Sequence, residues 1–126
     1  MIEFIPNYFE LSDDRGSFHG LVNFGTWKEV NIICSEAGTI RGNHYHKNTD
    51  ELFIILEGKI RITLQAVFSD EELDAEKKTV DVQTGDVFKI EKNVNHIFEI
   101  KENSKWLNIL SQILDKNSPD LHRIIK

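Results

Sequence analysis

Short apolar-rich runs with a period of two fill most of the chain, and turn residues separate them. In an extended strand this alternation places every second side chain on the same face. About eight runs are predicted as strands, at residues 17–24, 29–36, 51–58, 59–68, 78–85, 86–92, 96–102 and 105–114. So many short strands with almost no helix predict an all-β fold, either a sandwich or a barrel.

Two other segments differ from this pattern. Residues 69–78 begin with acidic and end with basic side chains, which suits a short helix or a solvated loop. Residues 119–126 begin with Pro119, which could occupy the first turn of a helix. The 126 residues contain no repeat, linker or low-complexity stretch, so we expect one domain over residues 1–126.

The composition excludes several classes of partner. The net charge is -6 and no basic cluster offsets it, which argues against nucleic acid. No apolar run approaches the roughly 20 residues of a membrane helix, and the N-terminal residues lack a secretion signal. The single cysteine, Cys34, has no partner for an internal disulfide. We therefore expect a cytoplasmic protein that does not contact a membrane.

Three histidines and one glutamate form the most informative pattern. His44 and His46 share one face of an extended segment, while Tyr45 points away from them. Glu51 opens the next strand, and a hairpin would bring it opposite the histidine pair. His96 also opens a strand. It follows a Gly-Asp turn, a short strand and a second, polar turn. Three imidazoles and one carboxylate suit a divalent transition metal such as zinc, iron, nickel or copper.

The spacing of these residues resembles the two motifs of the cupin superfamily. The first motif is matched at every defined position, which here are Gly38, His44, His46, Glu51 and Gly58. Residues 85–96 resemble the second motif, although Glu91 and Asn93 stand where proline and glycine are usual. The resemblance implies a double-stranded β-helix, the cupin jelly-roll barrel. It also implies a divalent metal inside the barrel, zinc foremost and iron, manganese or nickel as alternatives. The implied ligands are His44, His46, Glu51 and His96.

Three further stretches are similar to cupins that act on sugar nucleotides. Residues 13–18 and 40–47 resemble segments of keto-sugar-nucleotide epimerases and ketoisomerases. Residues 111–120 are similar to the C-terminal stretch of the zinc cupin domain in capsular-polysaccharide enzymes. The resemblance implies epimerisation or ketoisomerisation of a nucleotide-activated 4-keto sugar in polysaccharide biosynthesis. It gives His44 and His46 a catalytic role beside their role as ligands.

Arg41 is the first candidate for the substrate's diphosphate, because a guanidinium binds phosphate oxygens in a bidentate manner. Strict alternation would turn Arg41 away from the histidine pair, but a bulge at Gly42 would redirect it. Arg15 and Lys47 are further candidates for substrate binding.

Several alternatives stay open on the sequence alone. Three histidines and a glutamate would also serve an iron-dependent dioxygenase, and small cupins also serve as non-enzymatic sugar-binding or sensor modules. If all three histidines bind metal, the base is either a hydroxide held by the metal or another residue such as His19. His122 is interpreted as a structural polar residue. A homodimer is expected by analogy with jelly rolls, which expose sheet edges.

Overall fold

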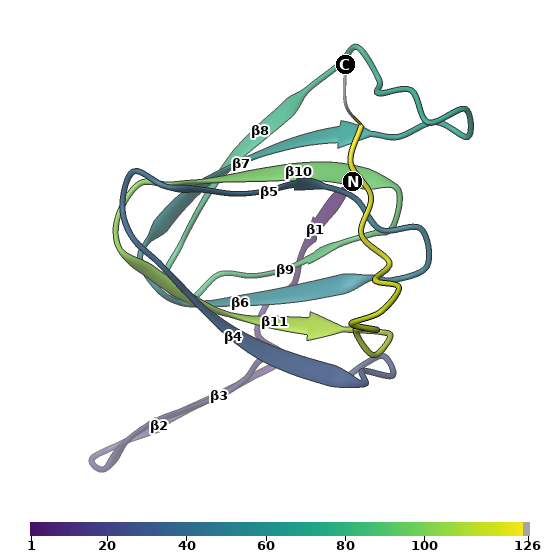
Figure 1. The fold of residues 1–126 in the computed structure, drawn as a ribbon. Coiled ribbons are helices and arrows are strands. Elements are labelled where there is room, and N and C mark those ends of the chain that lie inside the picture. The colour runs from purple at the N-terminus through teal and green to yellow at the C-terminus, as the bar shows by residue number, and fades with distance from the viewer. Residues whose placement is uncertain (125–126) are drawn as a thin grey trace.

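The computed structural model describes residues 1–124, which form eleven strands in three sheets and no helix. Figure 1 shows that the strands wrap into a barrel from which one hairpin projects. The strands are β1 (Ile2–Phe4), β2 (Phe9–Asp13), β3 (Gly16–Gly20), β4 (Glu29–Ser35), β5 (Ile40–His44), β6 (Glu51–Glu57), β7 (Lys59–Ala66), β8 (Lys78–Gln83), β9 (Val87–Ile90), β10 (Val94–Ile100) and β11 (Ser104–Leu110).

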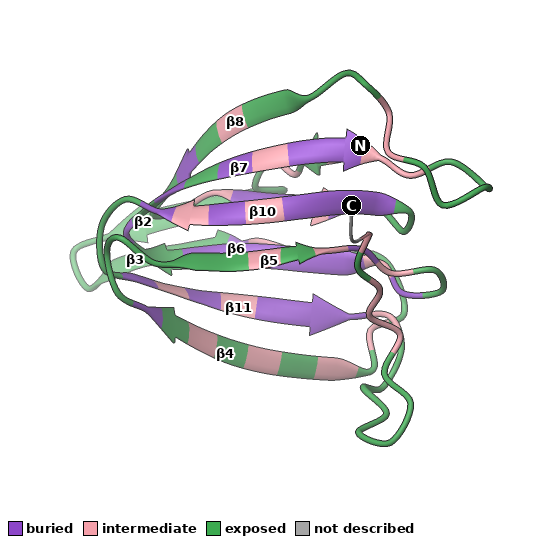
Figure 2. Ribbon diagram, turned by 45° about the horizontal axis from the view of Figure 1, so that its top comes forward, coloured by how far each residue is buried: buried purple, intermediate pink, exposed green. Residues whose placement is uncertain are grey.

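Two antiparallel sheets make the barrel. One has the strand order β1-β9-β6-β11-β4 and the other β5-β10-β7-β8. Their inner faces carry the buried apolar side chains, as the alternation on β7 shows: Ile60, Ile62 and Leu64 are buried, while Lys59 and Arg61 are exposed. Figure 2 shows buried positions along β6, β10 and β11 as well. The predicted all-β jelly roll is therefore confirmed.

β2 and β3 form a separate two-stranded hairpin. It extends away from the barrel in Figure 1 and is exposed along most of its length. The sequence predicted a strand over residues 17–24, whereas β3 covers only Gly16–Gly20 and pairs with β2, which had not been predicted.

Neither segment with helical potential forms a helix. Of residues 69–78, all but Lys78, which begins β8, belong to an excursion between β7 and β8 that a bridge between Val67 and Leu73 closes, so the loop alternative is correct. Residues 119–124 are not helical, because the backbone of His122 pairs with Tyr45 instead of with its own turn. Residues 125–126 of the expected helix lie outside the described residues.

None of the described residues forms a helix of the length and apolarity that crossing a membrane requires.

The predicted hairpin between His46 and Glu51 is wrong in one respect. β5 and β6 belong to different sheets, so residues 45–50 pass from one sheet to the other. Glu51 therefore approaches the histidines from the opposing sheet rather than from a neighbouring strand. Strand alternation alone could not distinguish these arrangements, because both put the same side chains on an inner face.

A bulge interrupts β5 at the position where the sequence predicted one. His44 pairs with His96 and Gly42 pairs with Ile97, which leaves Asn43 as an extra residue. Gly42 has a φ of +87° and Asn43 a φ of +61°. A Cβ on Gly42 would lie 2.7 Å from the backbone oxygen of His96. The bulge therefore needs glycine both for its backbone conformation and for the close approach of β10.

Candidate active site

The two sheets bring together the four residues predicted as metal ligands. His44 is the last residue of β5, His46 follows two positions later, and His96 lies beside His44 on β10. Glu51 is the first residue of β6 in the opposing sheet. One potential ligand atom from each of the four residues lies within 4.8 Å of the others. Residues that are 52 positions apart in the sequence thus form one cluster inside the barrel.

Glu51 is the centre of this cluster. Its Oε1 lies 2.7 Å from Nε2 of His46 and 3.2 Å from Nε2 of His96. Its Oε2 accepts a 2.6 Å hydrogen bond from the side-chain amide of Asn108. Burial of the carboxylate acts to raise the pKa of Glu51, but its contacts with His46 and His96 outweigh burial and hold this pKa well below its usual range.

Asn108 was missed by the sequence reasoning. It lies on β11 opposite Phe53 and is buried, with 7% of its surface exposed. A polar residue at an inward position of an otherwise apolar strand was the available signal. Its amide fixes one carboxylate oxygen of Glu51 and leaves the other directed at the imidazoles.

The polar atoms of this cluster fit a divalent cation. Nδ1 of His44, Nε2 of His46 and Oε1 of Glu51 are buried and have no aligned hydrogen-bond partner among the described residues. The 2.7 Å contact between His46 and Glu51 is therefore close without being a well-directed hydrogen bond. Buried polar atoms are nearly always hydrogen-bonded, and a cation would satisfy several of these together. Imidazole and carboxylate are the donors that zinc, iron, manganese and nickel accept.

Backbone carbonyl groups orient two of the imidazoles. Nδ1 of His96 lies 3.0 Å from the carbonyl oxygen of Val94, and Nδ1 of His46 contacts the carbonyl oxygen of Asp120. If each Nδ1 carries the proton, each Nε2 presents its lone pair toward Glu51. Metal-binding histidines usually have such a partner on the second ring nitrogen, because it fixes the tautomer and the ring orientation.

The histidines differ in their affinity for protons. Burial, together with the neighbouring His96, lowers the pKa of His44 to about 4, although Glu51 acts in the opposite direction. Burial also acts to lower the pKa of His46, but its close contact and charge interaction with Glu51 outweigh burial and raise this pKa. His44 is therefore neutral at pH 7, which is the form that binds metal.

His44 is expected to make the metal-free protein sensitive to acid. Its pKa is about 4 when folded and 6.5 ordinarily, so the unfolded chain takes up this proton first as the pH falls. The contribution of His44 to the free energy of unfolding is complete above pH 6.5. It is lost as the pH falls from 6.5 to 4, by about 3 kcal/mol in total. Urea unfolding of chelator-treated protein should show a steeper loss of stability in this window for wild type than for His44→Asn.

The raised pKa of His46 changes the stability with pH in the opposite direction. It contributes stability below the unfolded pKa, and that contribution is lost as the pH rises through the folded pKa. Because His46 is present in both proteins, the comparison of wild type with His44→Asn isolates His44. Equal pH slopes for the two proteins would contradict the assignment.

The cluster lines a cavity of about 540 Å³ between the two sheets. Aromatic side chains of Phe53, Phe98 and Trp106 form part of its wall, and Arg41 and Arg123 contribute guanidinium groups. The bulge thus does allow Arg41 to reach the pocket. Its Nε donates to Oγ of Ser35 at 2.9 Å, which fixes the orientation of the side chain. A concave pocket in which polar groups converge between apolar walls is a usual form of a small-molecule site.

Comparison with protein families decides the identity of the domain. Residues 11–121 match the family described as the polysaccharide biosynthesis C-terminal domain. The chain belongs to this family. A search of curated proteins by sequence finds no match.

Solved structures share the fold of this polysaccharide biosynthesis domain. A 3,4-ketoisomerase from Helicobacter canadensis is similar with a TM-score of 0.78 and 21% identity, over 98% of this chain and 90% of that one. The dTDP-4-dehydrorhamnose 3,5-epimerase of Bacillus anthracis gives a TM-score of 0.76 and 17% identity, over 99% and 85% of the two chains. The capsular polysaccharide assembling protein CapF from Staphylococcus aureus gives 0.67 and 23%, over 92% of this chain and 34% of CapF.

The other residues predicted to bind substrate lie outside the pocket that contains the cluster. Arg15 is in the turn of the β2–β3 hairpin, where its exposed guanidinium pairs with Asp13 at 2.7 Å. Lys47 pairs with Glu71 at 2.8 Å. Neither residue lines the pocket that contains the cluster. His19, the alternative base, also lies on the hairpin and does not line this pocket. Within one chain, the structure therefore brings only Arg41 of these candidates to the site.

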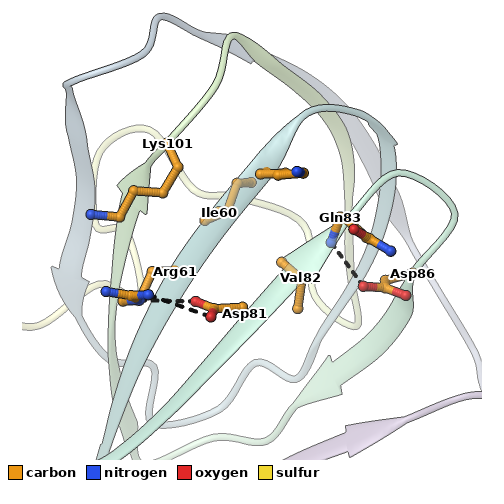
Figure 3. A pocket seen from close by; sticks show the side chains of 8 residues that line it. Ile60, Arg61, Asp81, Val82, Gln83, Asp86 and Lys101 are labelled. Carbon is orange, nitrogen blue, oxygen red and sulfur yellow. Dashed lines mark hydrogen bonds and ion pairs between the residues drawn. The ribbon is translucent and has the colours of Figure 1, made fainter.

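A second hollow of the domain, of about 470 Å³, lies over β7 and β8. Figure 3 shows that Arg61 bonds to Asp81 and that the backbone of Gln83 donates to Asp86. No histidine lines it. It also lies apart from the four-residue cluster, so its residues are suitable controls for the site.

Proposed function

We propose that the chain is an enzyme that epimerises or ketoisomerises a nucleotide-linked 4-keto sugar for polysaccharide biosynthesis. The family match and the likeness to ketoisomerases and an epimerase support this proposal. The observation that carries it is the four-residue cluster facing a pocket that also contains Arg41. Such a pocket can bind a sugar ketone at the cluster and a diphosphate at the guanidinium.

The reaction class follows from the chemistry of a ketone. A proton on the carbon next to the ketone becomes removable when the developing negative charge on oxygen is stabilised. A divalent metal held by His44, His46, Glu51 and His96 would supply this stabilisation as a Lewis acid. Phe53, Phe98 and Trp106 reduce the water around the sugar, which strengthens electrostatic interactions in the pocket.

Few side chains in the pocket can accept the proton from the sugar or return it. Apart from the cluster, the described lining of the pocket contains no histidine, aspartate or glutamate. Proton transfer at the sugar therefore falls to the cluster itself or to water that it orients. Nδ1 of His44 is buried without a hydrogen-bond partner, and the ring is neutral at pH 7.

Product analysis tests the proposed function. One of the similar structures, a 3,4-ketoisomerase from Thermoanaerobacterium thermosaccharolyticum, is a complex with TDP-4-keto-6-deoxyglucose, which makes this sugar a suitable probe. We expect NMR of the incubated sugar to show a shifted ketone or an inverted carbon, without consumption of oxygen. Oxygen uptake would support the dioxygenase alternative instead. Binding without conversion would support the sugar-binding or sensor alternative.

Elemental analysis tests the metal site separately from catalysis. We propose one divalent ion for each chain, with zinc first among the candidates and iron, manganese or nickel as alternatives. Loss of one of the four donors in His44→Ala should remove most of the metal. A full complement of metal in that variant would show that His44 is not a ligand.

Arg41→Ala is expected to weaken substrate binding more than turnover. Arg41 lines the pocket, its Nη2 donates to the carbonyl oxygen of Cys34 at 3.3 Å, and its Nη1 has no hydrogen-bond partner among the described residues, so we assign it to the diphosphate. Removing a charged hydrogen-bond donor should raise KM by at least about tenfold. Arg61→Ala is the matched control, because Arg61 lies in the second hollow. An unchanged KM for Arg41→Ala, or an equal rise for Arg61→Ala, would contradict the assignment.

We also propose that two copies associate through the β2–β3 hairpin. Phe9, Leu11 and Phe18 on this hairpin expose 45%, 53% and 64% of their surface. The edge strand β4 exposes Val30 and Ile32, each at 62%. An apolar hairpin and an apolar sheet edge on the same chain are complementary surfaces for a second copy. A cytoplasmic location stays a prediction.

Phe18→Asp is expected to dissociate this dimer, because it places a charge in the middle of the exposed apolar hairpin. Sedimentation equilibrium should give the mass of a dimer for wild type and of a monomer for the variant. Phe68→Asp is the control, since Phe68 is also half exposed, at 52%, but lies outside the hairpin. A monomeric wild type would refute the proposed dimer.

A further inference from the structure

The segment from Asp120 to Arg123, which we name the C-terminal strap, lies across the histidine-bearing segment of the chain. His122 and Tyr45 exchange two backbone hydrogen bonds, each of 2.9 Å. Nη1 of Arg123 donates to the carbonyl oxygen of Gly42 at 3.0 Å. The strap is therefore attached to the chain on both sides of His44.

Asp120 holds the connection between two of the proposed ligands. One of its carboxylate oxygens accepts the amide of Lys47 at 2.9 Å, and the other accepts the amide of Asn48 at 2.7 Å. The second oxygen also accepts the hydroxyl of Thr49 at 2.9 Å. These three donors belong to the loop that runs from His46 to Glu51 and crosses between the sheets. One side chain thus fixes the loop that sets the relative position of these ligands.

The backbone of Asp120 acts on His46 directly. Its carbonyl oxygen contacts Nδ1 of His46, while Nε2 of the same ring faces Glu51 at 2.7 Å. A carbonyl can only accept a hydrogen bond, so this contact favours the tautomer with the proton on Nδ1. That tautomer leaves the Nε2 lone pair for a cation.

We propose that Asp120 is a positioning residue of the metal centre, which orients His46 through its carbonyl group and the His46–Glu51 loop through its carboxylate. This inference rests on the proposed metal site, because His46 and Glu51 are two of its ligands. The sequence pattern gave no indication of it, since Asp120 lies 74 residues from His46.

The segment that precedes the C-terminal strap contains a natural control, Asp115. Asp115 accepts hydrogen bonds from the amides of Asn117 and Ser118, at 2.9 Å and 3.3 Å, and these close a local turn. It does not line the pocket. Asp115→Ala therefore removes an aspartate near the strap without changing a contact to the loop between His46 and Glu51.

The test is the affinity of the full chain for Zn²⁺, measured by competition with a chromophoric chelator. Loss of a residue that orients a ligand usually weakens metal binding by about 10- to 100-fold. We expect a loss of this size for Asp120→Ala and a change of less than about threefold for Asp115→Ala. Asp120→Asn should be intermediate, because its single oxygen can accept either from Lys47 or from Asn48 and Thr49, but not from both sides.

Two further readouts separate positioning from a general loss of stability. The visible spectrum of the Co²⁺-substituted Asp120→Ala protein should differ from that of wild type, because the spectrum reports ligand geometry. Thermal unfolding of the metal-free proteins reports stability alone. Wild-type zinc affinity in Asp120→Ala, or an unchanged Co²⁺ spectrum, would overturn the proposal even if the unfolding temperature falls. A wild type that binds none of the candidate ions Zn²⁺, Fe²⁺, Mn²⁺ and Ni²⁺ would instead refute the metal site, and the inference with it.

Discussion

Glu51→Gln is expected to abolish metal binding while leaving the barrel folded. The carboxylate is buried between two imidazoles, and Asn108 already donates to its second oxygen. The neutral amide of glutamine would remove the only negative charge of the four donors. It would also place either an N–H group near the imidazoles or a second amide against Asn108. Elemental analysis should find less than about a tenth of the wild-type metal, since a buried charge contributes several kcal/mol to such a site.

Glu57→Gln is the matched control for this variant. Glu57 is the last residue of the same strand, β6, and its side chain is exposed. This substitution makes the same chemical change without touching the cluster, so metal content should equal that of wild type. If Glu51→Gln retained a full equivalent of metal, Glu51 would not be a ligand.

Gly42→Ala is expected to cause the largest loss of stability among single-methyl additions near the site. The new Cβ would lie 2.7 Å from the backbone oxygen of His96, and the residue has a φ of +87°. Strain of the backbone and displacement of β10 together should cost about 3 kcal/mol. Urea unfolding of the metal-free protein measures this change in the free energy of unfolding.

Gly38→Ala separates the two causes. Gly38 has the same φ of +87°, but a Cβ there would meet no atom within 4 Å. It should therefore cost only the backbone strain, about 1 kcal/mol. Equal losses for the two variants would show that the close approach of Gly42 to His96 contributes nothing.

The sequence predicted the fold and the four clustered residues for identifiable reasons. A period of two is directly visible in segments such as β7, where apolar and charged residues alternate. The His-Tyr-His alternation put His44 and His46 on one face, and the flanking glycines marked the cupin motif. The bulge at Gly42 could also be predicted, because glycine permits the backbone conformation that redirects Arg41.

The remaining features depend on contacts between distant parts of the chain. Asn108 reaches Glu51 across 57 residues, and Asp120 reaches Lys47 across 73. Neither distance leaves a periodic trace in the sequence. The tail after Pro119 looked helical because local propensity favours a helix there, but pairing with Tyr45 and the crossing loop overrides that propensity.

Hydrogen exchange at the carbon next to the ketone tests whether the metal cluster promotes removal of that proton. TDP-4-keto-6-deoxyglucose would be incubated in deuterated water with metal-replete wild type, with Glu51→Gln and without protein, and followed by NMR and mass spectrometry. We expect deuterium beside the ketone with wild type and only background incorporation in the other two samples. A sugar that keeps its protium and its structure, with protein whose site is shown to be filled with metal, would refute metal-assisted proton abstraction by this protein.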